Sequence, residues 1–137
     1  MYLDPEQTAN ILKAHRIKLT RQRVEIGSIL LAPGQHLLAP QLLNLVNQNS
    51  EAVSKASIYN TVALFARKGL VHKVIINSAN VFYDSNTTHH HHFYNVSMGV
   101  LTAIPEEQII ISQLPELPDG TVIEGVDVTI RLRDKSP

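Results

Sequence analysis

Hydrophobic residues recur at helical spacing through the first half of the chain. One stripe has apolar residues at i, i+4, i+7 and i+8, as expected of a helix that packs by one face. Its members are Leu38, Leu42, Leu45 and Val46. A residue that caps helix N-termini, or a proline suited to a first turn, stands at the start of each helical stretch. The pattern predicts four helices, over residues 5–14, 21–31, from about residue 40, and over 54–68.

The helix predicted at residues 54–68 has the clearest division into two faces. On a helical wheel, Ile58, Val62 and Phe65 gather within about 60° of one another and form the inward face. The first two turns are otherwise small, polar or aromatic. Gly69 follows two basic residues and suits the left-handed position that ends a helix. We therefore expect one face of this helix to be buried and the other to be exposed.

The second half of the chain alternates in the manner of β-strands. Two apolar stretches after the last helix predict a hairpin, and two more flank a turn at residues 97–99. The short apolar run 109–111 fits either a strand or a helix. Residues 121–133 alternate throughout, which predicts a strand that buries one face. The expected strands are 70–76, 81–83, 92–96, 100–104 and 121–133.

The order of these elements predicts an α+β fold built from two domains. Helices followed by a β-hairpin are the order of a winged helix-turn-helix. A short polar hinge, residues 85–88, separates them from the later strands. We therefore expect an N-terminal winged helix-turn-helix domain at residues 1–84 and a small α/β dimerisation domain at residues 85–137. A half-domain of about 50 residues is too small to stand well alone, so we expect a homodimer.

Composition narrows the class of protein. The 137 residues are 44% hydrophobic and include no cysteine, which excludes disulfides and thiolate metal sites. No apolar run reaches the ~18 residues of a membrane span and no export signal is evident, so we expect a cytoplasmic protein without a membrane partner. The zero net charge hides a division between halves. Residues 1–84 carry nine Lys and Arg against five Asp and Glu, whereas residues 85–137 carry three against seven. A basic N-terminal half favours a nucleic-acid partner.

The segment 18–23 has the chemistry of a phosphate-binding helix start. It places Arg21 and Arg23 in a first turn, where their charges oppose the helix dipole. A bound phosphate would offset that cost by joining the exposed backbone N–H groups and the basic side chains. A solvated basic turn is the plainer interpretation of the same residues.

The exposed face of the helix at 54–68 has the chemistry of a recognition helix. Ser57 and Asn60 lie opposite the apolar face, with Lys55 and Tyr59 on its flank. Small residues admit close approach to base edges, while Asn and Tyr supply hydrogen bonds and van der Waals contact. Many amphipathic surface helices share this pattern, so the helix alone does not establish DNA binding.

Four consecutive histidines are the strongest chemical signal in the sequence. Side chains of a strand alternate between its faces, so His90 and His92 would share one face, and His89 and His91 the other. Residues at i and i+2 start about 7 Å apart, close enough for both rings to bind one ion. The run therefore predicts metal ligands, and it allows a possible second metal or haem site formed by His89, His91 and Asp127.

Five separated motifs resemble the signature of the ferric uptake regulator (Fur) family, in order and in spacing. They are LTRQR at 19–23, QH at 35–36, SIYNTV at 57–62, GLV at 69–71 and HHH at 90–92. Tracts at 83–87 and 114–120 are most similar to the iron response regulator (Irr) branch of the family. The resemblance implies a homodimeric transcription regulator, not an enzyme, that binds an A/T-rich inverted repeat in double-stranded DNA at genes of iron or haem metabolism.

The resemblance also assigns roles to individual residues. The DNA-facing set that it implies is Lys55, Ser57, Tyr59 and Asn60. The sensory metal site that it implies comprises His36, Asp84, His90 and His92. The effector is then a divalent metal ion (Fe, Mn or Zn), haem, or both. An effector bound by residues of both domains would couple its own binding to that of DNA.

The chain departs from the family pattern at four positions. Tyr83 and Ala103 stand where the family has acidic ligands, and Asn95 and Met98 replace a structural cysteine pair. Three imidazoles with one carboxylate form a softer site, which disfavours tight Fe²⁺ or Mn²⁺ binding and leaves Zn²⁺ or haem open. One alternative is therefore a metal-independent winged-helix regulator with a degenerate sensory site. A metallohydrolase is not expected, because no HExxH motif or acid pair accompanies the histidines.

Overall fold

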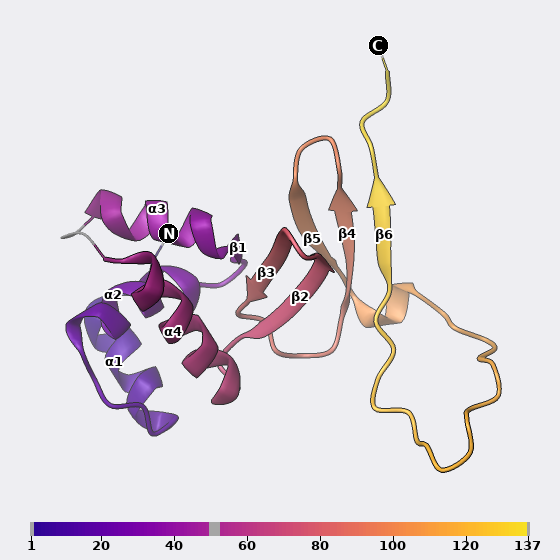
Figure 1. Ribbon diagram of the computed structural model, residues 1–137, viewed down its shortest axis with the longest axis horizontal. Helices are drawn as coiled ribbons and strands as arrows, with labels where there is room; N and C mark the ends of the chain where they lie inside the picture. The colour runs from indigo at the N-terminus through magenta and orange to yellow at the C-terminus, as the bar shows by residue number, and fades with distance from the viewer. Residues whose placement is uncertain (1, 50–52, 137) are drawn as a thin grey trace. The chain divides into compact units, whose positions relative to one another are not determined.

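A computed structural model of the chain, which describes residues 2–49 and 53–136, has an α+β fold (Figure 1). The chain divides into two compact units, Met1–Thr87 and Thr88–Pro137, and the division falls inside the polar segment 85–88. Within the described residues, four α-helices and a three-stranded sheet belong to the first unit, and a second three-stranded sheet belongs to the other. The α+β fold class predicted from the sequence is confirmed.

The helices of the first unit begin where the sequence places capping residues. They are α1 (Pro5–Ala14), α2 (Arg21–Leu30), α3 (Ala39–Asn49) and α4 (Lys55–Arg67). Before α1, α2 and α4, the side chains of Asp4, Thr20 and Ser54 each accept a hydrogen bond from a first-turn backbone N–H. Gly69, with φ of 78°, lies in the left-handed region just after α4. All four helix predictions are confirmed.

The apolar faces of these helices form the core of the first unit. Ile58, Val62 and Phe65 of α4 are each 0% exposed, as the helical wheel predicts. Helices α1 and α2 approach closely at Gly27, where a Cβ atom would lie 2.9 Å from Cγ2 of Thr8. This packing holds α4 by its apolar face and leaves its opposite face exposed.

The sheet of the first unit contains one strand that the sequence did not reveal. Its strands are β1 (His36–Leu38), β2 (His72–Asn77) and β3 (Asn80–Asp84), in the order β1-β3-β2 and all antiparallel. The β2–β3 hairpin confirms the predicted wing. Strand β1 is too short for a periodic pattern, and it forms because it pairs with β3. Its register sets His36 directly opposite Asp84.

The second unit is built on a mixed sheet in the order β5-β4-β6. Its elements are β4 (His91–Asn95), β5 (Val100–Ile104), the 3-10 helix η1 (Glu106–Gln108) and β6 (Thr129–Leu132). Strands β4 and β5 form a hairpin, whereas β6 runs parallel to β4. The hairpin confirms the strand pair predicted around residues 97–99.

Two predictions for the second unit are wrong. The strand predicted at 121–133 is limited to β6, because β4 is only five residues long and offers no further ladder partner. Its apolar side chains are not buried within this chain: Ile130 and Leu132 are each 38% exposed, and Val122 is 90% exposed. The run 109–111 is neither strand nor helix.

None of the helices in the described part of the chain has the length and hydrophobicity of a membrane span.

Candidate nucleic-acid interface and metal ligands

A surface hollow of about 510 Å³ lies between the start of α2 and the exposed face of α4. Of the six residues proposed from the sequence for DNA contact, four line it: Arg21, Arg23, Ser57 and Asn60. Thr20, Gln22 and Thr61 complete the lining. The hollow therefore brings the basic helix start and the small polar helix face together on one surface of the first unit.

The arginine side chains of this hollow are held by local contacts. Nε of Arg21 lies 3.0 Å from Oε1 of Glu25, one helical turn along α2. Nη1 of Arg23 donates a hydrogen bond of 2.8 Å to the backbone carbonyl of Lys18. These contacts orient both guanidinium groups, and the Glu25 carboxylate offsets part of the positive charge of Arg21.

Tyr59 and Lys55, the other two proposed DNA contacts, lie on the same helix outside the hollow lining. Tyr59 is 42% exposed, so its ring is accessible from solvent. Nζ of Lys55 lies 5.9 Å from the centre of the Tyr59 ring, within range of a cation–π contact. An exposed aromatic ring beside a cation is suited to base edges and phosphates.

His36 and Asp84 form a pair of possible ligands in the first unit. Nε2 of His36 lies 3.2 Å from Oδ2 of Asp84, and the Asp84 side chain is 1% exposed. The other carboxylate oxygen, Oδ1, accepts a hydrogen bond of 2.9 Å from the backbone N–H of Asn86. Two ligand atoms that bind one ion at about 2.1 Å are about 3.0–3.4 Å apart. The spacing of this pair therefore fits joint ligation of a divalent ion.

His90 and His92 form a second pair of possible ligands, in the other unit. Both residues are buried, and their ring centres lie 4.5 Å apart, with His90 just before the start of β4 and His92 within it. Nδ1 of His90 lies 2.7 Å from the backbone carbonyl of Thr88. A carbonyl only accepts, so Nδ1 carries the proton and a neutral ring has its lone pair on Nε2. Such a contact is the usual way in which a metal-binding histidine is oriented.

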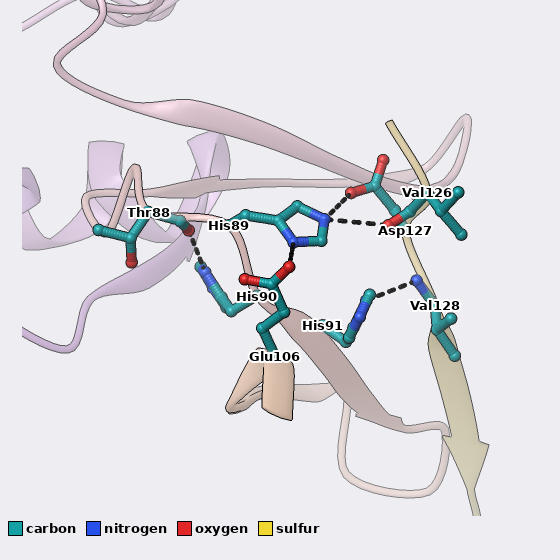
Figure 2. A network of polar contacts seen from close by, with 8 residues as sticks. All are labelled: Thr88, His89, His90, His91, Glu106, Val126, Asp127 and Val128. Carbon is teal, nitrogen blue, oxygen red and sulfur yellow. Dashed lines mark hydrogen bonds and ion pairs between the residues drawn. The ribbon is translucent and has the colours of Figure 1, made fainter. Parts of the chain in front are cut away.

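His89 and His91 take part in a different set of contacts (Figure 2). Nε2 of His89 lies 3.0 Å from the Val126 carbonyl and 3.5 Å from Oδ1 of Asp127. Its Nδ1 lies 3.1 Å from Oε1 of Glu106. The hydrogen bonds to Val126 and Glu106 raise the pKa of His89 above its usual value. No sequence pattern pointed to Glu106, because this carboxylate lies 17 positions from His89 and reaches it only through the fold.

The four positions that depart from the family pattern, Tyr83, Ala103, Asn95 and Met98, have the following surroundings in the structure. Burial raises the pKa of the Tyr83 phenol, and the electrostatic effect of the nearby Tyr59 raises it further. Ala103 pairs with His92 across β4 and β5 and offers no ligand atom. Oδ1 of Asn95 accepts a hydrogen bond from the Met98 backbone N–H, which closes the turn that joins these strands. This hydrogen bond between Met98 and Asn95 thus stabilises the turn of the hairpin.

The chain is similar to known proteins along most of its length. The model of the ferric uptake regulator family matches residues 14–131. The ferric uptake regulation protein of Synechococcus elongatus is 36% identical over 97 residues, which are 68% of this chain and 66% of that protein. The structure of the ferric uptake regulator from Pseudomonas aeruginosa with manganese has a TM-score of 0.69 at 20% identity, covering 94% of this chain and 98% of that one. The Helicobacter pylori regulator, whose structure reveals three functional metal binding sites, has a TM-score of 0.66 at 16% identity and covers 95% and 88%. This chain thus spans about two thirds of the Synechococcus relative.

Proposed function

The chain belongs to the ferric uptake regulator family, and on that premise we propose that it is a transcription regulator whose affinity for DNA depends on a bound metal ion. The observation that carries the proposal is the hollow between α2 and α4, where basic and small polar side chains share one exposed surface. Members of the family are regulators of transcription and not enzymes. Family membership therefore argues against the metallohydrolase alternative.

In the proposed complex, α4 lies in the major groove of double-stranded DNA. Tyr59, Ser57 and Asn60 contact base edges, while Arg21 and Arg23 contact phosphates and fix the position of the helix. A homodimer would present two such helices related by a two-fold axis, which matches an inverted repeat. We propose that the operator is an A/T-rich inverted repeat. We also propose that the protein binds it in the cytoplasm.

The proposed effector site comprises His36 and Asp84 from the first unit and His90 and His92 from the second. Two observations support the proposal. Nε2 of His36 and Oδ2 of Asp84 have the spacing of two ligands of one ion, and the rings of His90 and His92 lie close together, with their centres 4.5 Å apart. The ion supplies a positive charge and a fixed geometry that residues of both units can share, so its binding free energy can favour one arrangement of the DNA-binding unit. Three imidazoles and one carboxylate favour Zn²⁺ over Mn²⁺ or Fe²⁺. The structure of the Pseudomonas aeruginosa regulator contains manganese, so Mn²⁺ is kept among the ions to test. Haem is the alternative effector.

The finer assignments are also proposals. The tracts 83–87 and 114–120 support membership of the iron response regulator branch, and so a role at genes of iron or haem metabolism. Dimerisation is supported by the apolar side chains of β6, because Ile130 and Leu132 are each 38% exposed in the single chain.

The experiment measures binding to a duplex that the Zn²⁺-loaded protein has selected from a random pool. We expect tighter binding to this duplex than to a scrambled duplex of the same composition, and a steep fall in affinity with salt. His90→Ala/His92→Ala should keep the fold but lose the effect of Zn²⁺. Equal affinity for both duplexes would refute sequence-specific regulation. Selective binding that ignores Zn²⁺, Mn²⁺, Fe²⁺ and haem would instead establish the metal-independent alternative.

A further inference from the structure

We propose that the four consecutive histidines have two different roles. His90 and His92 bind the effector ion. His89 and His91 are positioning residues, which bind the backbone of Val126 and Val128 and no ion. Under this proposal each chain takes up one divalent ion. The inference rests on the proposed function, because it presupposes the metal site of His90 and His92. It replaces a second metal site, which the same four histidines would allow, with a clamp made of hydrogen bonds.

The contacts of His91 define one half of the clamp (Figure 2). The backbone N–H of Val128 donates a hydrogen bond of 3.0 Å to Nδ1 of His91, whose side chain is 3% exposed. The lone pair of Nδ1 is therefore directed at an amide and not at an ion. A metal ion on this nitrogen would displace the Val128 N–H, and a buried N–H without a partner is costly.

Both backbone groups of Val128, its N–H and its carbonyl, are therefore hydrogen-bonded to residues of β4. Its carbonyl accepts a hydrogen bond of 3.1 Å from the backbone N–H of His92, while its N–H donates to the His91 ring. Two residues earlier, the Val126 carbonyl accepts from Nε2 of His89. The imidazoles thus continue the parallel pairing of β4 and β6 to residue 126, beyond the start of β6 at Thr129.

The surroundings of His89 disfavour a metal ion for a second reason. The carboxylates of Glu106 and Asp127 approach opposite nitrogens of its ring, Nδ1 and Nε2. One ion cannot bind His89 and also lie between both carboxylates, because the two nitrogens point away from each other. The rings of His89 and His91 meet edge to face, at 84° and 5.1 Å, and do not converge on a shared point. The arrangement is that of a ring held between acceptors.

The clamp has a consequence for the effector site. His90 and His92 alternate along the chain with His89 and His91, whose rings are bonded to Val126 and Val128. The backbone that carries the proposed ligands is therefore fixed to the segment that leads into β6. Loss of these two hydrogen bonds would not remove the ligand atoms of His90 and His92. It would let residues 126–128 separate from the strand that carries them.

The test compares two double variants of this chain, one that can keep the two hydrogen bonds of the clamp and one that cannot. In His89→Gln/His91→Asn, the Gln amide can still donate to Val126 and the Asn carbonyl oxygen can still accept from Val128. In His89→Leu/His91→Leu, neither bond can form. Calorimetry with Zn²⁺ alone gives the number of ions per chain, and hydrogen exchange followed by NMR reports on the Val128 amide without any metal.

We expect one Zn²⁺ per chain in the wild type and in His89→Gln/His91→Asn, and none in His90→Ala/His92→Ala. The Val128 amide should exchange at the wild-type rate in the Gln/Asn variant and about 5–30 times faster in the Leu/Leu variant. Two ions in the wild type and one in the Gln/Asn variant would overturn the clamp in favour of a second metal site. Fast exchange in the Gln/Asn variant would overturn it as well. Unchanged Zn²⁺ binding in His90→Ala/His92→Ala would refute the effector site itself, which separates that failure from a failure of the clamp.

Discussion

His92 of β4 and Ala103 of β5 stand directly opposite each other in the antiparallel register of the second unit. Residues paired in this way project to the same face of a sheet, with Cβ atoms about 4.5–5.5 Å apart. A carboxylate at position 103 would therefore lie beside His92, on the face of the proposed ligands. Hard divalent ions gain most from an added anionic oxygen, so Ala103→Glu should raise the affinity for Mn²⁺ by at least about tenfold. Calorimetric titration with Mn²⁺ measures the change.

The control for this variant is Met98→Glu. Met98 is 66% exposed in the turn that joins β4 to β5, so a carboxylate there would add the same charge to the hairpin away from His92. Equal gains from Ala103→Glu and Met98→Glu would mean that general attraction, and not ligation, draws the ion. No gain from Ala103→Glu would argue against His92 as a ligand.

The exposed ring of Tyr59 carries the second prediction. If the ring contacts base edges, Tyr59→Ala should cost roughly 1–3 kcal/mol of specific binding and much less of non-specific binding. Fluorescence anisotropy with the selected and the scrambled duplex separates the two. Arg67→Gln, which removes a charge from the last turn of the same helix, is the matched control. It should affect both duplexes alike, whereas an unchanged operator affinity in Tyr59→Ala would exclude this ring from base recognition.

The fold was predictable from the sequence where its signals are local. Helix α4 follows from the spacing of Ile58, Val62 and Phe65 and from its caps, because both act within a few turns. Strand β1 has no such signal and exists only through its pairing with β3. The strand predicted at 121–133 was too long for a related reason. Alternation indicates a potential apolar face, but a strand also requires a pairing partner of equal length.

The candidate sites divide in the same way. The shared face of His90 and His92 follows from strand alternation alone. The partnership of His36 with Asp84 depends on the register of two strands far apart in the chain, and only the resemblance to a known family pointed to it. Glu106 was missed altogether, because its contact with His89 is created by η1 and leaves no pattern in the sequence.

The apolar side chains of β6 carry the third prediction. Ile130 and Leu132 alternate on one face of an edge strand and are partly exposed in the single chain. A second copy that covers them would remove them from water, whereas an aspartate at such an interface would be buried without a partner. Ile130→Asp/Leu132→Asp should therefore sediment as a monomer at micromolar concentration, where the wild type sediments as a dimer. Ile75→Asp is the control, since Ile75 is 68% exposed on the hairpin of the other unit. Monomeric wild-type protein would contradict the homodimer.

The close approach of α1 and α2 at Gly27 carries the last prediction. Alanine favours a helix over glycine by about 1 kcal/mol, but its Cβ would lie 2.9 Å from the buried Cγ2 methyl of Thr8. Overpacking of this kind costs about 1–3 kcal/mol, so Gly27→Ala should lower the free energy of unfolding or leave it unchanged at best. Urea denaturation measures that free energy.

Thr8→Ser separates the two effects because it removes only the obstructing methyl group. The serine hydroxyl can still donate to the Asp4 carbonyl, as Oγ1 of Thr8 does over 2.9 Å. In the Thr8→Ser background the clash is gone and the helix preference of alanine remains, so Gly27→Ala should now stabilise the protein by about 1 kcal/mol. The sign of the Gly27→Ala effect should thus depend on the residue at position 8. If Gly27→Ala has the same effect in both backgrounds, the contact between these two helices is not what requires glycine at position 27.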